Sequence, residues 1–356
     1  MLRASIWMCL LLAACSGGQA NTRCESTQEM EVVCGFQNPE DLVLAPDGQT
    51  LIASQAAHLD GSGGGGLVSF TPGDTGPTPL FPTDSQDSGP TDWGAPECPG
   101  PPDAAFSPHG IDIGRGPGGE WLLLAVNHGG RESVEFFEVA TSSDGTVLRW
   151  RGCVPAPEGG NFNDVTILPG GGFLVTQMFP AGGAAITAFH VLRMLAFGSE
   201  LGRVLEWQPE TGFTDVPGTE AAFPNGLELS EDGSVLYLNV YLGDELRAIR
   251  RETGEPLFAA EVESPDNVTW SQDGRLLVAS HPGTFFETLA CAGIESGSCV
   301  RAFRVVAIDP GTGDSELLID SEGTPMGAAT VALQVGDDLW LGSFIGDRIA
   351  RVPLPR

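Results

Sequence analysis

The sequence predicts an all-β fold, and two observations favour this class. Glycine (49 residues) and proline (27 residues) are abundant, and they separate many short runs of β-forming residues. Helical periodicity is weak along most of the chain. The sequence therefore predicts many short strands joined by tight turns.

A repeated phrase predicts the architecture. Each copy consists of one or two polar residues, a short apolar strand, a Gly/Asp turn and a second apolar strand. Six copies occur, the last of them weaker, at residues 40–54, 109–128, 163–176, 225–239, 266–280 and 328–343. Allowing for insertions, their spacing is that of a four-stranded propeller blade of roughly 40 to 50 residues. We predict a six-bladed β-propeller over residues 34–356, preceded by a linker over residues 15–33.

The first residues are typical of an export signal. A charged start precedes a short apolar run at residues 6–14, which is too short to cross a bilayer. Residues 12–15 (LAAC) resemble a bacterial lipobox, so residues 1–14 would be removed and Cys15 would carry lipid. The following Ser16 is typical of outer-membrane lipoproteins. We expect a lipoprotein of the bacterial cell envelope, and cleavage with release to the periplasm or the medium is the alternative.

Export places the six remaining cysteines in an oxidising compartment, where disulfides are expected rather than zinc ligation. No CxxC spacing occurs among them. Cys24 and Cys34, and Cys291 and Cys299, are close enough in the sequence to close short loops, so we predict these two disulfides. The remaining cysteines would then form Cys98–Cys153. Spacing alone leaves other connectivities open.

The formal net charge is −30, and all 17 basic residues are arginine. Such a surface repels nucleic acid and anionic lipid headgroups, and it attracts divalent cations. Because the chain has no lysine, mechanisms that use a Schiff base or a lysine nucleophile are excluded. We therefore expect no nucleic-acid partner.

Two segments interrupt the repeats. Residues 71–102 are rich in Pro, Gly, Asp and Thr and show no strand pattern, so we predict a long insertion of the kind that often borders a site. Residues 184–197 form the best helical candidate and are apolar on nearly every face. This helix would lie over the rim as a lid or dip into a membrane interface, or else it would connect strands and pack on the sheet.

A predicted hairpin carries a histidine at each end. Apolar β-forming residues flank a Gly/Pro-rich turn. If Gly116 pairs with Gly119, His109 lies opposite Val126, and His128 is its diagonal neighbour on the same face. One residue of slip would separate the two rings. Adjacent imidazoles would form a general base with an orienting partner, and the alternative is two unrelated histidines at strand ends.

Residues at one offset in every repeat meet around the axis, because the innermost strand of each blade lines the channel. At this offset the chain carries His109 and otherwise short oxygen donors, namely Glu40, Asp41, Asn163, Asp164, Asn225, Asp266 and Asn267. Such oxygens suit calcium, which takes six to eight oxygen ligands. Neighbouring residues of a strand point in opposite directions, so the Glu40-Asp41 and Asn163-Asp164 pairs would serve two stacked calcium ions. The alternative is that these residues cap turns.

These residues resemble the calcium-dependent paraoxonases, a family of arylesterases and lactonases within the gluconolactonase-like six-bladed propellers. The two histidine phrases separate this family from gluconolactonase-type and strictosidine-synthase-type relatives. The matching phrases run in order along nearly the whole mature chain: residues 39–42 (PEDL), 109–111 (HGI), 126–128 (VNH), 133–137 (SVEFF), 163–164 (ND), 223–226 (FPNG), 266–267 (DN), 281–282 (HP) and 330–332 (TVA).

The resemblance implies a role for each site residue. The catalytic calcium would be held by Glu40, Asn163, Asn225, Asp266 and Asn267. The structural calcium would be held by Asp41, Asp164 and the backbone carbonyl of Ile111. The catalytic residues would be His109 as the base, His128 as its orienting partner and Asp266 as the alternative base. The substrate pocket would include Phe223, His281 and Thr330.

We therefore expect a calcium-dependent hydrolase of lactones or aryl esters. Sugar-lactone hydrolysis, or a non-catalytic calcium-stabilised propeller that binds at the cell surface, is the alternative. Two departures from the family matter. Residues 339–352 lack the cysteine with which the family closes the ring, so closure should rest on strand pairing. Residues 184–197 match the family's membrane-contacting lid in position but not in side chains, which leaves the substrate preference open.

Overall fold

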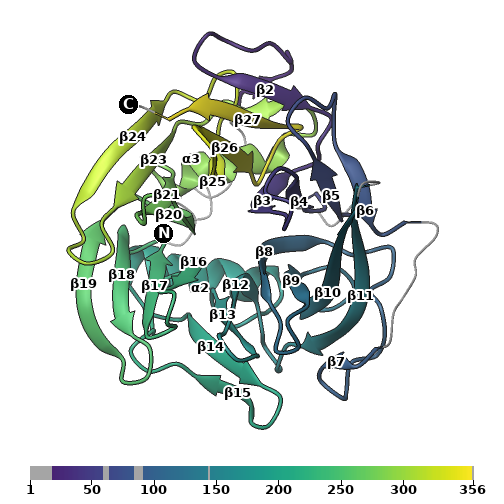
Figure 1. Cartoon of the computed structure of the whole chain (residues 1–356). Helices are drawn as coiled ribbons and strands as arrows, with labels where there is room; N and C mark the ends of the chain where they lie inside the picture. Colours follow the sequence, from purple (N-terminus) through teal and green to yellow (C-terminus); the bar gives the residue numbers. More distant parts are fainter. Residues whose placement is uncertain (1–17, 59–63, 84–90, 143–144, 355–356) are drawn as a thin grey trace.

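The computed structural model describes residues 18–58, 64–83, 91–142 and 145–354. The predicted signal peptide and Cys15 lie outside these residues, so both remain predictions. Six antiparallel sheets surround a central channel and form the blades of a six-bladed β-propeller (Figure 1). The predicted fold class is confirmed.

Each blade contributes one strand to each of four concentric layers. The innermost strands contact one another around the ring; they are β3 (Pro39–Leu44), β8 (Pro108–Arg115), β12 (Phe162–Ile167), β16 (Pro224–Leu229), β20 (Pro265–Trp270) and β25 (Ala329–Val335). The second strands are β4 (Leu51–Gln55), β9 (Trp121–Asn127), β13 (Phe173–Gln177), β17 (Val235–Val240), β21 (Leu276–Ser280) and β26 (Asp338–Ser343). The third strands are β5 (Gly66–Phe70), β10 (Ser133–Ser142), β14 (Arg203–Gln208), β18 (Glu245–Arg250), β23 (Phe303–Ile308) and β27 (Arg348–Pro353). The outer strands are β6 (Thr78–Phe81), β11 (Gly145–Pro155), β15 (Gly212–Asp215), β19 (Glu255–Glu261), β24 (Ser315–Ser321) and β2 (Glu31–Cys34).

The second strands explain the apolar runs in the sequence. Strand β21 (LLVAS) is buried at every position, and β9 (WLLLAVN) is buried at all positions but the first. A strand that is covered on both faces by neighbouring blades needs apolar side chains throughout, whereas a half-exposed strand alternates. The core therefore lies between the blades. Between the first two blades, for example, Phe81 packs edge-on against Phe106 and Phe137.

Strand pairing closes the ring, as expected. Strand β2, near the N-terminus, is the outer strand of the last blade and pairs antiparallel with β27, so that Val33 lies opposite Ile349 (Figure 1). The propeller thus begins at Glu31, three residues before the boundary that the repeats suggest. The extra residues belong to an outer strand, which carries no repeat signal of its own.

A buried arginine anchors the chain that precedes β2. The side chain of Arg348, on β27, is fully buried. Its guanidinium donates hydrogen bonds to the carbonyl oxygens of Arg23 (2.6 Å), Asn21 (2.9 Å) and Pro325 (3.0 Å). Strand β1 (Ala20–Asn21) pairs with β22 (Ser298–Cys299) beside this contact. The N-terminal segment is therefore part of the folded unit.

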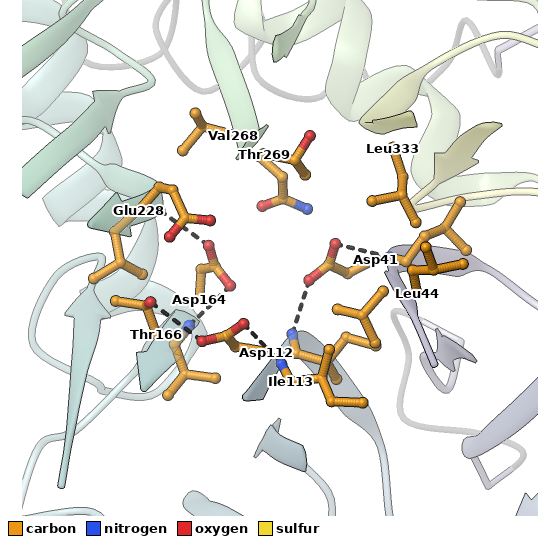
Figure 2. A pocket seen from close by; sticks show the side chains of 16 residues that line it. Asp41, Leu44, Asp112, Ile113, Asp164, Thr166, Glu228, Val268, Thr269 and Leu333 are labelled. Carbon is orange, nitrogen blue, oxygen red and sulfur yellow. Dashed lines mark hydrogen bonds between the residues drawn. The ribbon is translucent and has the colours of Figure 1, made fainter. Parts of the chain in front are cut away.

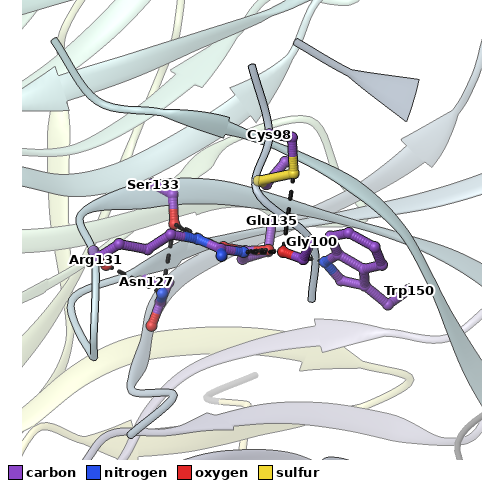
Figure 3. The surroundings of a disulfide bond; sticks show 8 residues. Cys98, Gly100, Asn127, Arg131, Ser133, Glu135 and Trp150 are labelled. Carbon is purple, nitrogen blue, oxygen red and sulfur yellow. Dashed lines mark hydrogen bonds and ion pairs between the residues drawn. A yellow bond between two sulfur atoms is a disulfide. The ribbon is translucent and has the colours of Figure 1, made fainter. Parts of the chain in front are cut away.

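The insertion over residues 71–102 contains two strands that its composition hides. Strand β6 is the outer strand of the first blade, and β7 (Trp93–Gly94) runs parallel to β11 as a fifth strand of the second blade. Both are short and partly exposed (TPLF and WG), so neither shows an apolar strand pattern. The Cys98–Cys153 disulfide ties this insertion to β11 (Figure 3). Disulfides also join Cys24 to Cys34 and Cys291 to Cys299, so the predicted connectivity is confirmed.

The predicted helix is present as α2 (Ala184–Phe197). Met194 packs against Phe179 and Ala222 beside the channel mouth, whereas Phe189 and Phe197 are exposed. Two further short helices lie near this mouth, α3 (Phe285–Leu289) and the 3-10 helix η1 (Ala290–Gly293). None of the helices in the described ranges is both long enough and apolar enough to span a membrane.

Replacement of the buried arginine should destabilise the ring closure. In Arg348→Met, three backbone carbonyl groups lose their donor inside the protein, and we expect the free energy of unfolding to fall by about 3–5 kcal/mol. Urea denaturation measures this change. Arg351→Met is the control on the same strand, because Arg351 is 41% exposed in its pair with Glu31, and its loss should cost about 0–1 kcal/mol. Equal costs for the two variants would contradict the anchoring role.

Candidate active site

The predicted site residues lie on β-bulges. In every blade the register between the first and second strands shifts near the start of the first strand: between Pro39 and Asp41, Pro108 and Ile111, Phe162 and Val165, Pro224 and Leu227, Pro265 and Val268, and Ala329 and Val331. The residues within these shifts are the ones predicted to meet around the axis. A bulge re-aims side chains away from the regular ladder, so the repeated offset has a structural basis.

Two glycines allow the bulges to approach one another. A Cβ atom on Gly110 would lie 2.7 Å from the carbonyl oxygen of Asn163, and one on Gly226 would lie 2.6 Å from that of Asp266. Both distances are shorter than any real contact of a Cβ atom. Each glycine follows a site residue, His109 or Asn225, so the strands pack most closely where the site is built.

Most of the predicted catalytic residues line one cavity of about 180 Å³, which we call the histidine cavity. Its polar wall consists of Glu40, His109, Asn163, Asn225 and Asp266. Its other wall is mainly apolar, with Met178, Phe223, Tyr241, Phe285, Thr288, Leu289, Ala292 and Phe344. The cavity therefore joins a set of polar ligands to a surface that suits an apolar substrate.

The polar wall fits a cation. Among the described residues, eight buried side-chain polar atoms lack a hydrogen-bond partner, and four of them belong to the predicted calcium ligands. These four are oxygens: Glu40 Oε2, Asn163 Oδ1, Asn225 Oδ1 and Asn267 Oδ1. Buried oxygens without partners are costly unless a ligand satisfies them, and carboxylate and amide oxygens are the ligands that calcium prefers. The donor set is thus consistent with calcium.

The buried carboxyl groups lie near imidazoles rather than guanidinium groups: His109 Nε2 is 3.8 Å from Glu40 Oε1, and His281 Nδ1 is 3.5 Å from Asp266 Oδ2. No arginine lines the histidine cavity. Burial, with the charges of Asp41 and Asp266, raises the pKa of Glu40 well above its ordinary value. Burial likewise raises the pKa of Asp266 to about 8, although a hydrogen bond with Asn225 opposes this shift. Among the described residues no three acidic, histidine or cysteine side chains group as a metal site, so a cation here depends on the amide oxygens.

The residues of the predicted structural ion line a second cavity of about 190 Å³ deeper in the channel, the carboxylate cavity. Asp41 and Asp164 point into it together with Asp112 and Glu228 (Figure 2). Ile111 also lies here, and its N–H donates to Asp41 Oδ2 (2.8 Å). Burial raises the pKa of Asp41 to about 7 and that of Asp164 well above its ordinary range.

The carboxylates of this cavity bridge neighbouring blades. Three of the four accept a hydrogen bond from a backbone N–H of the next blade: Asp41 from Ile111 (2.8 Å), Asp112 from Ile167 (2.7 Å) and Asp164 from Leu227 (3.0 Å). Glu228 accepts from Leu229 of its own strand (2.8 Å). The sequence analysis missed Asp112 and Glu228. Their signal is a single acidic residue inside an apolar strand, as in Ile111-Asp112-Ile113.

The two histidines meet, although the hairpin register differs from the prediction. Ile111 pairs with Ala125, one residue off the predicted ladder, and the bulge between Pro108 and Ile111 restores the expected pairing at the strand end. The rings of His109 and His128 pack edge to face with centroids 5.0 Å apart. Asn163 Nδ2 donates to His109 Nε2 (3.2 Å). Burial and the charge of His128 lower the pKa of His109 to about 3, so this imidazole is neutral.

A carboxylate that the sequence analysis missed completes this pair. Glu132 Oε2 accepts a hydrogen bond from His128 Nδ1 (2.9 Å). Burial opposes protonation of His128, but the charge and the hydrogen bond of Glu132 raise its pKa overall. The signal is a glutamate four residues after the histidine, which carries meaning only once the loop geometry is known.

The predicted pocket residues lie at different depths. Phe223 lines the histidine cavity and has a left-handed backbone (φ 64°) just before the innermost strand of its blade. His281 is buried behind the wall, where its Nδ1 lies 3.0 Å from Tyr241 Oη and 3.5 Å from Asp266 Oδ2. Thr330 is also behind the wall, and its hydroxyl donates to the carbonyl oxygen of Glu40 (2.6 Å). Tyr241 thus stands between His281 and the cavity.

No protein-family model matches the chain. The plant protein strictosidine synthase-like 3 of Arabidopsis thaliana is 26% identical over 189 residues, which cover 46% of this chain and 47% of that protein. The match therefore spans about half the length of this curated relative.

Solved structures resemble the whole chain. A gluconolactonase of Xanthomonas campestris is 17% identical, with a TM-score of 0.52 and coverage of 95% of this chain and 94% of that chain. A luciferin-regenerating enzyme is 14% identical, with a TM-score of 0.53 and coverage of 91% and 95%. At these identities the likeness shows the fold, and the resemblance to paraoxonases is carried by the site residues alone.

Removal of divalent cations should leave the folded protein least stable at alkaline pH. The pKa values of Asp41 and Asp266, about 7 and about 8, lie above the ~3.9 of an unfolded aspartate. The folded state therefore holds these protons more tightly, and the resulting stabilisation is lost as pH rises through these values. We expect the free energy of unfolding of chelator-treated protein to fall between about pH 5 and about pH 9, and calcium to restore more of it at the higher pH.

Urea denaturation with and without calcium measures this dependence. Asp266→Asn should flatten it, whereas Asp320→Asn on the exposed outer strand β24 should leave it unchanged. A calcium effect of the same size at both pH values would contradict the prediction.

Proposed function

We propose that the chain is a calcium-dependent hydrolase of lactones or aryl esters of the paraoxonase type. The observation that carries this proposal is the set of unpaired buried oxygens on Glu40, Asn163 and Asn225, which line the same cavity as His109 of the His109–His128 pair. A purely structural ion would need no neutral imidazole beside it. The combination of a cation site, a base and an apolar wall is what hydrolysis of an apolar ester requires.

The residues of the polar wall have distinct roles in this proposal. Glu40, Asn163, Asn225 and Asp266 of this wall would hold the catalytic calcium together with Asn267, which lines the carboxylate cavity and donates to Glu40 Oε1 (2.9 Å). Bound there, calcium supplies a Lewis acid that polarises the carbonyl group of the ester or lactone. His109 accepts a proton from the attacking water at Nε2, once the water replaces the Asn163 N–H that donates to this atom (3.2 Å). His128, with its raised pKa, is the partner to which this proton passes.

The apolar wall favours an aliphatic or aromatic substrate over a sugar lactone. Phe223, Phe285, Leu289 and Phe344 offer ring and aliphatic surface to the cavity. A polyol would need hydrogen-bond partners for its hydroxyl groups, and leaving them unpaired would weaken its binding. We therefore propose an acyl or aryl chain as the group that occupies this wall.

Two further roles belong to the proposal. A second calcium ion in the carboxylate cavity, at Asp41, Asp164 and Ile111, would neutralise buried charge and hold the blades together. Lipidation of Cys15 would tether the enzyme to the bacterial cell envelope.

We expect the mature domain to hydrolyse phenyl acetate or aliphatic lactones in a calcium-dependent way. Activity should disappear on chelation and return with added calcium, because the buried oxygens then regain their ligand. Initial rates on a panel of these substrates measure the effect, and sugar lactones in the same panel test the substrate class. Absence of turnover in a cooperatively folded, calcium-binding protein would refute the enzyme proposal and favour a binding module.

The variant His109→Gln should lose activity by about 100-fold or more, because the water then lacks a base. Its calcium content and melting temperature should stay near those of the unchanged protein, since His109 is not among the proposed ligands. His58→Gln, a histidine outside the cavity lining, is the control. Full activity of His109→Gln would remove His109 from the mechanism and leave Asp266 as the candidate base.

A further inference from the structure

The carboxylate of Glu132 is fixed at both oxygens. Oε2 accepts the Nδ1–H of His128 (2.9 Å), and Oε1 accepts the backbone N–H of Phe162 (2.6 Å). Phe162 begins β12, the innermost strand of the next blade, while the carbonyl of Glu132 accepts a hydrogen bond from Ala156 (2.9 Å). Glu132 therefore joins two blades at the edge of the histidine pair.

These contacts determine where the imidazole protons lie. An ionised carboxylate only accepts, so the proton of neutral His128 is on Nδ1 and its lone pair is on Nε2, while the ring packs edge to face against His109. Asn163 Nδ2 only donates, so neutral His109 carries its proton on Nδ1 and a lone pair on Nε2. Both rings are thus oriented from outside, one by Glu132 and the other by Asn163.

The neighbouring Glu135 differs from Glu132. Its side chain is fully buried and accepts hydrogen bonds from Arg131 (2.8 Å), Ser133 (2.6 Å) and Trp150 (2.8 Å) (Figure 3). Its charge is therefore neutralised within its own blade. Glu132 directs its charge at His128 instead.

We propose that Glu132 is a positioning residue for the histidine pair. It holds His128 in the Nδ1–H tautomer and stabilises the imidazolium that forms when a proton arrives. In this step the water oxygen forms its bond to the carbonyl carbon of the ester, the carbonyl π electrons move to the carbonyl oxygen, and a water O–H bond breaks as His109 Nε2 gains the proton. The Nδ1 proton of His109 then passes to His128 Nε2. The inference rests on the proposed hydrolase function.

The Phe162 contact makes the variant Glu132→Gln informative. A carboxamide has one acceptor, and the N–H of Phe162 requires it. The amide NH₂ group then faces His128 Nδ1, which must become an acceptor, so the proton of His128 moves to Nε2. Its Nε2–H in turn occupies the position that should accept from His109. Replacing one carboxylate oxygen of Glu132 by an NH₂ group thus reverses the tautomer of His128, whereas Glu132→Asp keeps the charge and both acceptor oxygens.

Two measurements on the full mature domain test the proposal. Long-range ¹H–¹⁵N spectra at alkaline pH report the tautomer of each neutral imidazole, and the chain has only 5 histidines to assign. Steady-state hydrolysis of phenyl acetate separates kcat from KM. We expect Glu132→Gln to show His128 as Nε2–H and to lose about 100-fold or more in kcat, with KM changed by less than about threefold. Glu132→Asp should keep Nδ1–H and recover about tenfold or more of that loss.

Glu138→Gln is the matched control. Glu138 lies on the same blade, has a similar side-chain exposure (29% against 22%) and pairs with Arg151 rather than with a histidine. Its loss should change neither the tautomer nor kcat. An unchanged His128 tautomer or an unchanged kcat in Glu132→Gln, with wild-type turnover intact, would overturn this inference alone. Absence of turnover in the wild-type protein would overturn the proposed function and this role with it.

Discussion

Buried negative charge along the axis is the constraint on which the rest of this propeller depends. Six acidic side chains, Glu40, Asp41, Asp112, Asp164, Glu228 and Asp266, face the two cavities of the channel, and no arginine lines either cavity. Backbone N–H groups of the next blade donate to Asp41, Asp112 and Asp164. The same carboxyl groups thus join the blades and favour a counterion, so the proposed cation binding would be coupled to blade packing in one free-energy balance.

The channel chemistry and the ring closure place different demands on the chain. The innermost strands carry polar bulges and glycines that bring them together, whereas the second strands are apolar because both of their faces are covered. The outer layer closes the ring, because β2 pairs there with β27. Arg348 donates hydrogen bonds to backbone carbonyl groups of the segment that precedes β2. Ring closure therefore rests on a strand pair and a buried arginine side chain.

The sequence predicted the blade repeat, helix α2 and the two short-range disulfides because these depend on local pattern, and Cys98–Cys153 followed as the remaining pair. It also identified Glu40, Asn163, Asn225 and Asp266 as neighbours. These residues occupy the same position in each repeat, and this position does not depend on how the strands of a blade are paired. It placed the His109 hairpin one residue out of register because a bulge leaves no compositional signal. The sequence analysis also missed Glu132 and Asp112. Glu132 lies in a loop whose geometry the sequence does not reveal, and Asp112 is a single acidic residue in an apolar strand.

The amide of Asn163 links two parts of the site through its two ends. Its nitrogen donates to His109, and its oxygen is the one left without a partner. A flip of this amide would turn its oxygen toward the imidazole and move the proton of His109 to Nε2. In the proposed function one planar group therefore serves both as a calcium ligand and as the donor that fixes the His109 tautomer, so a mutation at Asn163 would impair ion binding and base orientation together.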